Sequence, residues 1–151
     1  MNEELSDMLS LYQAMHSSVD HMIEPLSDQE WLSKPFPTMN NVAAIVEHIT
    51  LVERKFLGVL GGQPDQVDAG APFKATSWDV SAIKENYAKI ATRAEEIMIK
   101  LSPEELDQHA AKLGIGNLNK RQLVVYLIAH TAHHRGQIPI VKKLNANPPQ
   151  A

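Results

Sequence analysis

The amino-acid sequence predicts an all-α protein that folds as a four-helix bundle. Four long segments repeat apolar residues every three or four positions, which is the period of an amphipathic helix. Capping residues, prolines and glycines bound these segments. The length of 151 residues fits one domain with one hydrophobic core, so residues 1–151 are expected to form a single domain. Four such helices can bury their apolar faces against one another as a bundle.

The first half of the chain is expected to contain two of the long helices. The first spans residues 2–23 and ends before the first proline of the chain, because proline disrupts a continuing helix. Residues 27–30 read Ser-Asp-Gln-Glu, a capping box that starts a short helix. The second long helix is expected over residues 39–60, with Thr38 or Asn40 as its cap and a glycine pair after its end.

A long connection follows the second helix. Residues 63–79 are rich in proline, glycine and alanine and show no periodicity. A loop of this length in a small domain is either disordered or functional. Because Phe73 and Trp78 supply two aromatic anchors, the segment is expected to cover part of one end of the bundle.

The second half of the chain is expected to contain the other two long helices. The third spans residues 81–101. Residues 102–105 form another capping box, with proline at the first helical position, and predict a short helix. The fourth long helix spans residues 119–144, with a kink at Pro139, and residues 145–151 are expected to be frayed.

Two histidines occupy the apolar stripe of the fourth helix. The stripe consists of residues three or four positions apart: Leu123, Leu127, His130, His134, Ile138 and Val141. Since residues four apart lie on one face, the imidazoles of His130 and His134 are expected to point inward together, with His133 on the flank. Unpaired ring nitrogens are costly to bury. The pair is therefore either hydrogen-bonded in the core or bound to a shared metal ion.

The second helix offers a third histidine on its predicted core stripe. That stripe reads Ala44, Ile45, His48, Val52, Phe56 and Val59, while Glu47 and Glu53 are expected on more exposed faces. His48 alone would be interpreted as a buried histidine bonded to a carbonyl group. Together with His130 and His134, it is interpreted as the third ligand of a metal site. His16 and His21 of the first helix are expected at the surface or its boundary.

Three imidazoles would leave a fourth coordination position open, as in catalytic zinc sites. Imidazole also suits nickel, iron and copper, so the ligand type does not name the ion. A coordinated water would have a pKa near ~7, and a coordinated thiol would be deprotonated. No general base can be chosen: His133 and Glu47 are near the site by spacing, but either can be ordinary surface. Arg135 can hold an anionic substrate or pair with a carboxylate of its own bundle.

Composition excludes several other functions. The net charge of −4 argues against a nucleic-acid or anionic membrane surface, and no apolar run reaches the length of a membrane span. The N-terminal residues lack the pattern of a signal peptide, which predicts a cytoplasmic protein. Without cysteine, the chain has no disulfide, thiolate ligand or cysteine nucleophile. Any thiol chemistry would need a thiol brought by a substrate.

The histidine motifs resemble those of a known family. Val46-Glu47-His48-Ile49, followed by His130-Thr131-Ala132-His133-His134-Arg135-Gly136-Gln137-Ile138, resembles the DinB/YfiT-like superfamily of bacterial four-helix proteins. The resemblance extends over nearly the whole chain. It implies an up-down-down-up bundle, often dimeric, in which His48, His130 and His134 bind a divalent ion such as zinc or nickel.

The resemblance also suggests several activities. Characterised relatives include transferases and isomerases that use low-molecular-weight thiols such as bacillithiol, mycothiol and glutathione, and others are regarded as metal-dependent hydrolases. The first expectation is a homodimeric, metal-dependent enzyme that activates a low-molecular-weight thiol for transfer to a small electrophilic substrate. A metal-dependent hydrolase and a non-catalytic, metal-binding stress-response module are the alternatives. A metal-free bundle with three core histidines is a further alternative.

Overall fold

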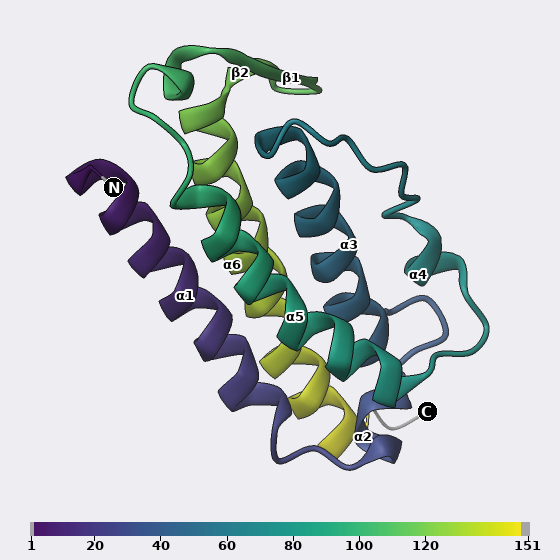
Figure 1. Cartoon of the computed structure of the whole chain (residues 1–151). Helices are drawn as coiled ribbons and strands as arrows, with labels where there is room; N and C mark the ends of the chain where they lie inside the picture. Colours follow the sequence, from purple (N-terminus) through teal and green to yellow (C-terminus); the bar gives the residue numbers. More distant parts are fainter. Residues whose placement is uncertain (1, 149–151) are drawn as a thin grey trace.

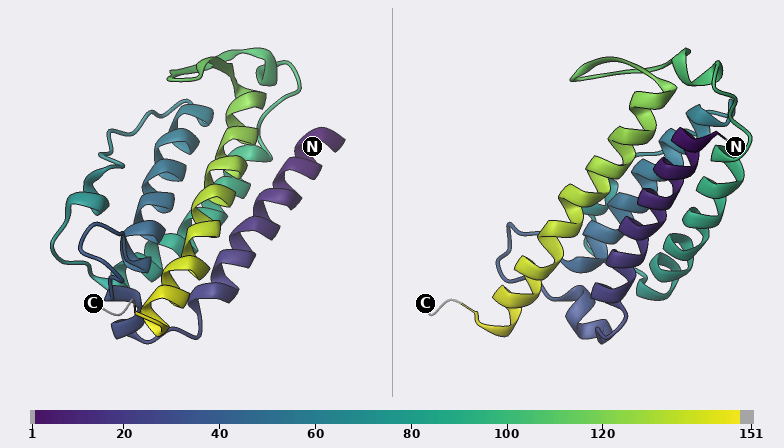
Figure 2. Two further views of the ribbon diagram at one scale, coloured as in Figure 1. Left: turned by 180° about the vertical axis from the view of Figure 1, so that it is seen from behind. Right: turned by 90° about the vertical axis from the view of Figure 1, so that its left-hand side faces the viewer.

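The computed structural model describes residues 2–148. Four long helices pack side by side (Figure 1): α1 (Glu3–Ile23), α3 (Val42–Leu60), α5 (Val80–Met98) and α6 (Lys120–Ala146). Helices α1 and α6 run in one direction and α3 and α5 in the other, which is the predicted up-down-down-up order (Figure 2). Helix α3 packs against α5 and α6, and α1 packs against the same two helices. The predicted all-α bundle is confirmed.

Each long helix begins at an asparagine or aspartate that caps it. The capping side chains accept a hydrogen bond from the backbone N–H three residues later, and they belong to Asn2, Asn41, Asp79 and Asn119. The cap of α3 predicted at Thr38 or Asn40 is therefore wrong. Asn41 is the cap because its buried side chain also donates to the Leu32 carbonyl, which anchors the start of α3 to the short helix α2 (Asp28–Leu32).

The buried apolar side chains form two clusters, one toward each end of the bundle. On α6 the clusters are separated by the stretch between Ile128 and Ile138, and on α1 by the stretch between Tyr12 and Val19. Buried polar side chains fill the level between the clusters: His16, Thr50, Glu53, Thr131 and His134. The middle of the bundle is thus a polar layer enclosed by two apolar ones.

The connection between α5 and α6 differs from the prediction. The capping box at Ser102 and Glu105 forms, but it supports only a 3₁₀ turn (Glu105–Asp107). The chain then makes an antiparallel hairpin of β1 (His109–Leu113) and β2 (Gly116–Asn119). The predicted short helix is therefore wrong beyond this turn: Leu113 pairs with Gly116, whose positive φ suits glycine, and the hairpin buries Leu118 against the core.

The connection between α3 and α5 lies beside the bundle. Its residues include the short helix α4 (Ala71–Lys74), which packs against α3 along the side of the bundle (Figure 1). The prediction that this segment covers one end is therefore wrong. Its position follows from tertiary contacts with α3 that sequence periodicity does not encode.

Helix α6 continues through Pro139 to Ala146, two residues beyond the predicted end. Asn145 is helical and its side chain donates to the Ser33 carbonyl, so the predicted fraying is wrong at residues 145–146. Residues 149–151 of the predicted tail lie outside the described residues. Within residues 2–148, none of the helices combines the length and the apolar character needed to cross a membrane.

Two helical glycines should respond oppositely to alanine. A Cβ at Gly58 would lie 2.7 Å from the Gln63 carbonyl oxygen, whereas one at Gly136 would have no heavy atom within 4 Å. Gly58→Ala should therefore lower the free energy of unfolding by about 1–3 kcal/mol. Gly136→Ala should raise it by about 0.5–1 kcal/mol, because alanine favours helix. Urea denaturation measures both, and destabilisation by Gly136→Ala would show an unrecognised contact at that position.

Candidate metal centre

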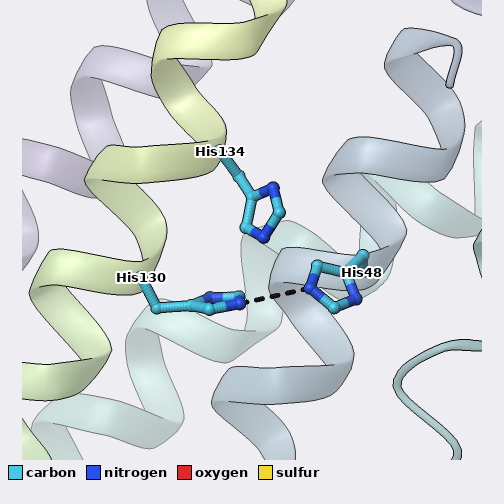
Figure 3. Close-up of side chains that lie close together, drawn as sticks. All are labelled: His48, His130 and His134. Atoms are coloured by element: carbon cyan, nitrogen blue, oxygen red, sulfur yellow. Dashed lines mark hydrogen bonds between the residues drawn. The ribbon is translucent and has the colours of Figure 1, made fainter. Parts of the chain in front are cut away.

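His48 of α3 and His130 and His134 of α6 face one another across the contact between the two helices (Figure 3). One ring nitrogen of each histidine lies within 4.8 Å of those of the other two. The ring centroids of His130 and His134 are 4.5 Å apart, as expected for residues one helical turn apart. The structure therefore brings together the three residues that the sequence singled out.

The three rings lie at the edge of the core, where solvent can reach them. His134 is buried, but His48 and His130 are half-buried. On α6 the fully inward position is Thr131, not His130, and on α3 it is Ile49. The prediction that all three imidazoles point into the core is therefore correct only for His134. The other residues of the predicted stripes are buried, except that Val59 of α3 is half-buried like His48 and His130.

Hydrogen bonds fix the orientation of two of the rings. The Nδ1–H of His48 donates to the Ala69 carbonyl oxygen at 2.6 Å, and the Nδ1–H of His134 donates to Gln137 Oε1 at 2.8 Å. Each Nδ1 must carry the proton because its partner is an acceptor. Each Nε2 is consequently left with a lone pair. Metal-binding histidines typically bind the ion through one ring nitrogen and donate a hydrogen bond from the other, as these two rings can.

The third ring also fits a metal ion. Nε2 of His130 lies 3.1 Å from Nε2 of His48 (Figure 3), close to the separation of about 3.3 Å for two nitrogens on one tetrahedral zinc. Within residues 2–148, Nδ1 of His130 is buried and has no hydrogen-bond partner. A metal ion would replace the contact between the two Nε2 atoms.

The surroundings keep the three imidazoles neutral. Burial lowers the pKa of His48 and of His134. Burial, reinforced by the charges of the neighbouring histidines, lowers the pKa of His130 to about 3. Since a metal binds the neutral ring, all three lone pairs are available near pH 7.

Segment 61–79 covers part of the cluster. The Phe73 ring lies 4.4 Å from the His48 ring and 6.2 Å from the His134 ring, centroid to centroid. The Tyr126 ring lies 6.1 Å from the His130 ring, centroid to centroid. These apolar faces limit the access of water to the nitrogens. Sequence reasoning identified Phe73 as an anchor but not as a neighbour of the histidines.

The other polar residues near the motif have different positions. His133 is exposed and its ring lies 4.8 Å from that of His134. Glu47 is half-buried, and burial raises the pKa of its carboxyl group. The Nε–H of Arg135 donates to the Ser18 hydroxyl of α1 at 2.6 Å, and among residues 2–148 this arginine has no carboxylate partner.

Glu53 contradicts the prediction of an exposed side chain. It is fully buried, accepting a hydrogen bond from the Tyr12 hydroxyl at 2.6 Å and one from the Thr131 hydroxyl at 2.7 Å. The network joins α1, α3 and α6 beside His130. Burial raises the pKa of Glu53 to about 7, although both donors oppose the rise. Sequence reasoning missed it because glutamate usually lies at the surface.

His16 also differs from the prediction, whereas His21 is exposed as expected. His16 is buried, with its ring stacked at 3.8 Å on the ring of Tyr87. The His16 Nε2–H donates to the Tyr87 carbonyl, and the Tyr87 hydroxyl donates back to the His16 carbonyl. These two hydrogen bonds satisfy polar groups of both residues, so His16 is explained as a core histidine between α1 and α5.

Gln137 should influence metal affinity without binding the ion. Gln137→Leu removes the acceptor of the His134 Nδ1–H, and we expect it to weaken metal binding by about 10–100-fold. Gln137→Glu retains an acceptor and should bind metal at least as tightly as the unaltered protein. Competition with a fluorescent chelator measures both affinities. Equal affinity for the leucine variant would show that this hydrogen bond does not support the site.

Comparisons with known proteins agree with this architecture. A family model described as the DinB superfamily matches residues 11–138. No curated protein matches the chain significantly. A conserved protein from Enterococcus faecalis has a similar solved structure, with 13% identity, a TM-score of 0.78 and coverage of 95% of this chain and 97% of that one.

Two Bacillus subtilis structures are also similar. YfiT, described as a probable metal-dependent hydrolase with an unusual four-helix bundle topology, shares 11% identity with a TM-score of 0.74, over 97% of this chain and 90% of its own. A DinB-like protein shares 18% identity with a TM-score of 0.71, over 96% of both chains. At these identities the structures show a common fold, and the family match covers most of the sequence. The chain therefore belongs to the DinB superfamily.

Proposed function

We propose that His48, His130 and His134 bind a divalent metal ion, with zinc or nickel as the expected metal, and that the loaded protein is an enzyme. The observation that carries this proposal is the convergence of three neutral imidazoles, two of them held by hydrogen bonds with Nε2 free. A three-histidine site leaves a coordination position for a substrate. The half-buried position of His48 and His130 gives a small molecule access to it.

The substrate that we propose is a low-molecular-weight thiol, which is transferred to a small electrophile. A divalent metal supplies Lewis acidity, which lowers the pKa of a coordinated thiol. The chain's own residues position the reaction: Ala69 and Gln137 hold the rings of His48 and His134, and Phe73 limits the access of water. Because the chain has no cysteine, the thiol comes from the substrate.

A hydrolase is the second candidate, and one comparison favours it, because YfiT is described as a probable metal-dependent hydrolase. A base that takes the proton of the attacking water would help a hydrolase, although a coordinated water of pKa near ~7 would be partly ionised without one. Among the described residues, the metal-binding group contains histidines but no carboxylate. Glu53 is engaged by Tyr12 and Thr131. A coordinated thiol would be fully deprotonated at about pH 7, whereas a coordinated water would be only partly ionised, so we place thiol transfer first.

A panel of assays separates these activities. Protein loaded with zinc or nickel is incubated with bacillithiol, mycothiol or glutathione and a chromogenic electrophile, and in parallel with activated esters and amides. We expect metal-dependent thiol consumption that is absent from His134→Ala. Ester or amide cleavage without thiol consumption would favour the hydrolase. Turnover in neither assay, with metal bound, would favour a non-catalytic metal-binding module.

Two further expectations stand beside this proposal. The family resemblance implies a homodimer, and the sequence predicts a cytoplasmic protein that binds neither nucleic acid nor membrane. Sedimentation analysis of the metal-loaded protein measures the first, and fractionation of cells that produce the full chain measures the second.

A further inference from the structure

A groove of about 260 Å³ lies between α3, α6 and the residues that precede α3. Its apolar lining comes from Met39, Ile45, Ile140 and Val141, and its uncharged polar lining comes from Thr38, Asn40 and Gln137. No charged side chain lines it within the part of the chain that the structure describes. The groove can therefore accept an apolar group, but it offers no counter-ion for a charged one.

The groove and the histidine cluster share one residue. Gln137 lines the groove, and its Oε1 accepts the hydrogen bond from His134 Nδ1. The amide NH₂ of the same side chain is left as a donor for a ligand.

The groove lies next to the histidine cluster along the axes of both helices. Ile45 precedes His48 by three residues, and Gln137 and Val141 follow His134 by three and seven. Because α3 and α6 run in opposite directions, both steps lead toward the same end of the bundle (Figure 1). At 1.5 Å per residue, the groove extends from about 5 to about 10 Å beyond the histidines along the helix axes.

We propose that this groove binds the electrophile to which the metal-bound thiol is transferred, and that it selects an electrophile with an uncharged, mainly apolar group such as a short alkyl chain or a ring. An oxygen of that group would accept a hydrogen bond from the Gln137 amide. A charged group is disfavoured because it would lose hydration without gaining a residue of opposite charge. This inference rests on the proposed metal-dependent function, because the electrophile would have to lie beside the thiol that the metal binds.

Hydroxamates of different length test the proposal, because each carries the same metal-binding head. The probes are acetohydroxamate, hexanohydroxamate and adipic acid monohydroxamate, whose chain resembles that of hexanohydroxamate but ends in a carboxylate. Their affinities for the cobalt-loaded full chain are measured by visible spectroscopy, with metal retention checked by elemental analysis. We expect hexanohydroxamate to bind about tenfold tighter than acetohydroxamate, or more, because part of its chain becomes buried. The carboxylate probe should lose this advantage.

A pair of matched variants locates the effect. Ile140 and Val125 are both apolar residues of α6 with similar exposure, 54% and 50%, but only Ile140 lines the groove. Ile140→Asp should reduce the preference for the longer chain to less than about threefold, while Val125→Asp should preserve it. The comparison of the three probes on the unaltered protein needs no variant, so it holds even if Ile140→Asp fails to fold.

The outcomes separate this inference from the proposed function. Failure of all three hydroxamates to bind a metal-loaded protein, or failure of the protein to take up metal, would overturn both. Binding of acetohydroxamate without any preference for the longer chain would overturn the groove alone. The groove proposal would also be overturned if hexanohydroxamate kept its tighter binding in Ile140→Asp, or if the probe with the terminal carboxylate bound as tightly as hexanohydroxamate.

Discussion

Replacing His134 with alanine should abolish stable metal binding. His134 supplies one of three converging ring nitrogens, and its Nε2 is held in place by the hydrogen bond to Gln137. Changes to the outer partners of metal ligands already cost about 10–100-fold in affinity, so loss of a ligand should cost more than about 100-fold. His48→Ala should have the same effect, although His48 lies on a different helix.

Elemental analysis after dialysis against a weak chelator measures this loss. The matched control is His133→Ala, because His133 neighbours His134 in sequence but is exposed and lies outside the group of converging nitrogens. The control should retain about one ion per chain. Full metal retention by His134→Ala, or equal loss from His133→Ala, would contradict the proposed ligand set.

Replacing Glu53 with glutamine should remove a large pH dependence of stability. Burial raises the pKa of Glu53 from 4.5 to about 7 in the folded protein, so its protonated form is favoured there. A rise of this size corresponds to about 3 kcal/mol. Glutamine is uncharged and similar in shape, so it can accept a hydrogen bond from one of Tyr12 and Thr131 and donate one to the other.

The direction of the effect follows from proton linkage. Between pH 4.5 and about 7 the folded protein binds a proton at Glu53 that the unfolded chain has released. The contribution of Glu53 to stability therefore falls as the pH rises through this window and is constant above it. The lowered pKa values of His48, His130 and His134 act oppositely, because they reduce stability as the pH falls below about 6.5.

Comparing the variant with the unaltered protein isolates Glu53, since the histidines are present in both. Urea denaturation of the metal-free proteins at intervals from pH 4.5 to 8 gives the two unfolding free energies. We expect the difference to shift in favour of Glu53→Gln by about 3 kcal/mol across this range. A difference that does not change with pH would show that Glu53 ionises normally in the folded protein.

The sequence predicted those features that depend on local chemistry. Helix periodicity and the capping box at Ser27 are local signals: periodicity defines the four long helices, and the capping box defines the short helix α2. The histidine cluster was also predictable, because His130 and His134 are one turn apart and His48 lies close to the core face of another helix. His130 lies at the edge of its stripe, beside the fully buried Thr131, and is still within reach of His48.

Features that depend on contacts between distant segments were not predicted. Glu53 is buried because Tyr12 and Thr131, far away in the sequence, supply its donors. The position of segment 61–79 depends on Ala69 and Phe73 meeting His48. Neither set of contacts can be predicted from the spacing of apolar residues in the sequence. The hairpin after α5 was missed because its strands are too short to show a clear alternation.

The convergence of three imidazoles on one ion is tested most directly by X-ray absorption spectroscopy of the zinc-loaded protein. We expect three nitrogen ligands at about 2.0–2.1 Å, with the outer-shell scattering of imidazole rings, and one further light ligand. A spectrum with fewer than three imidazoles, or with oxygen ligands alone, would contradict the site.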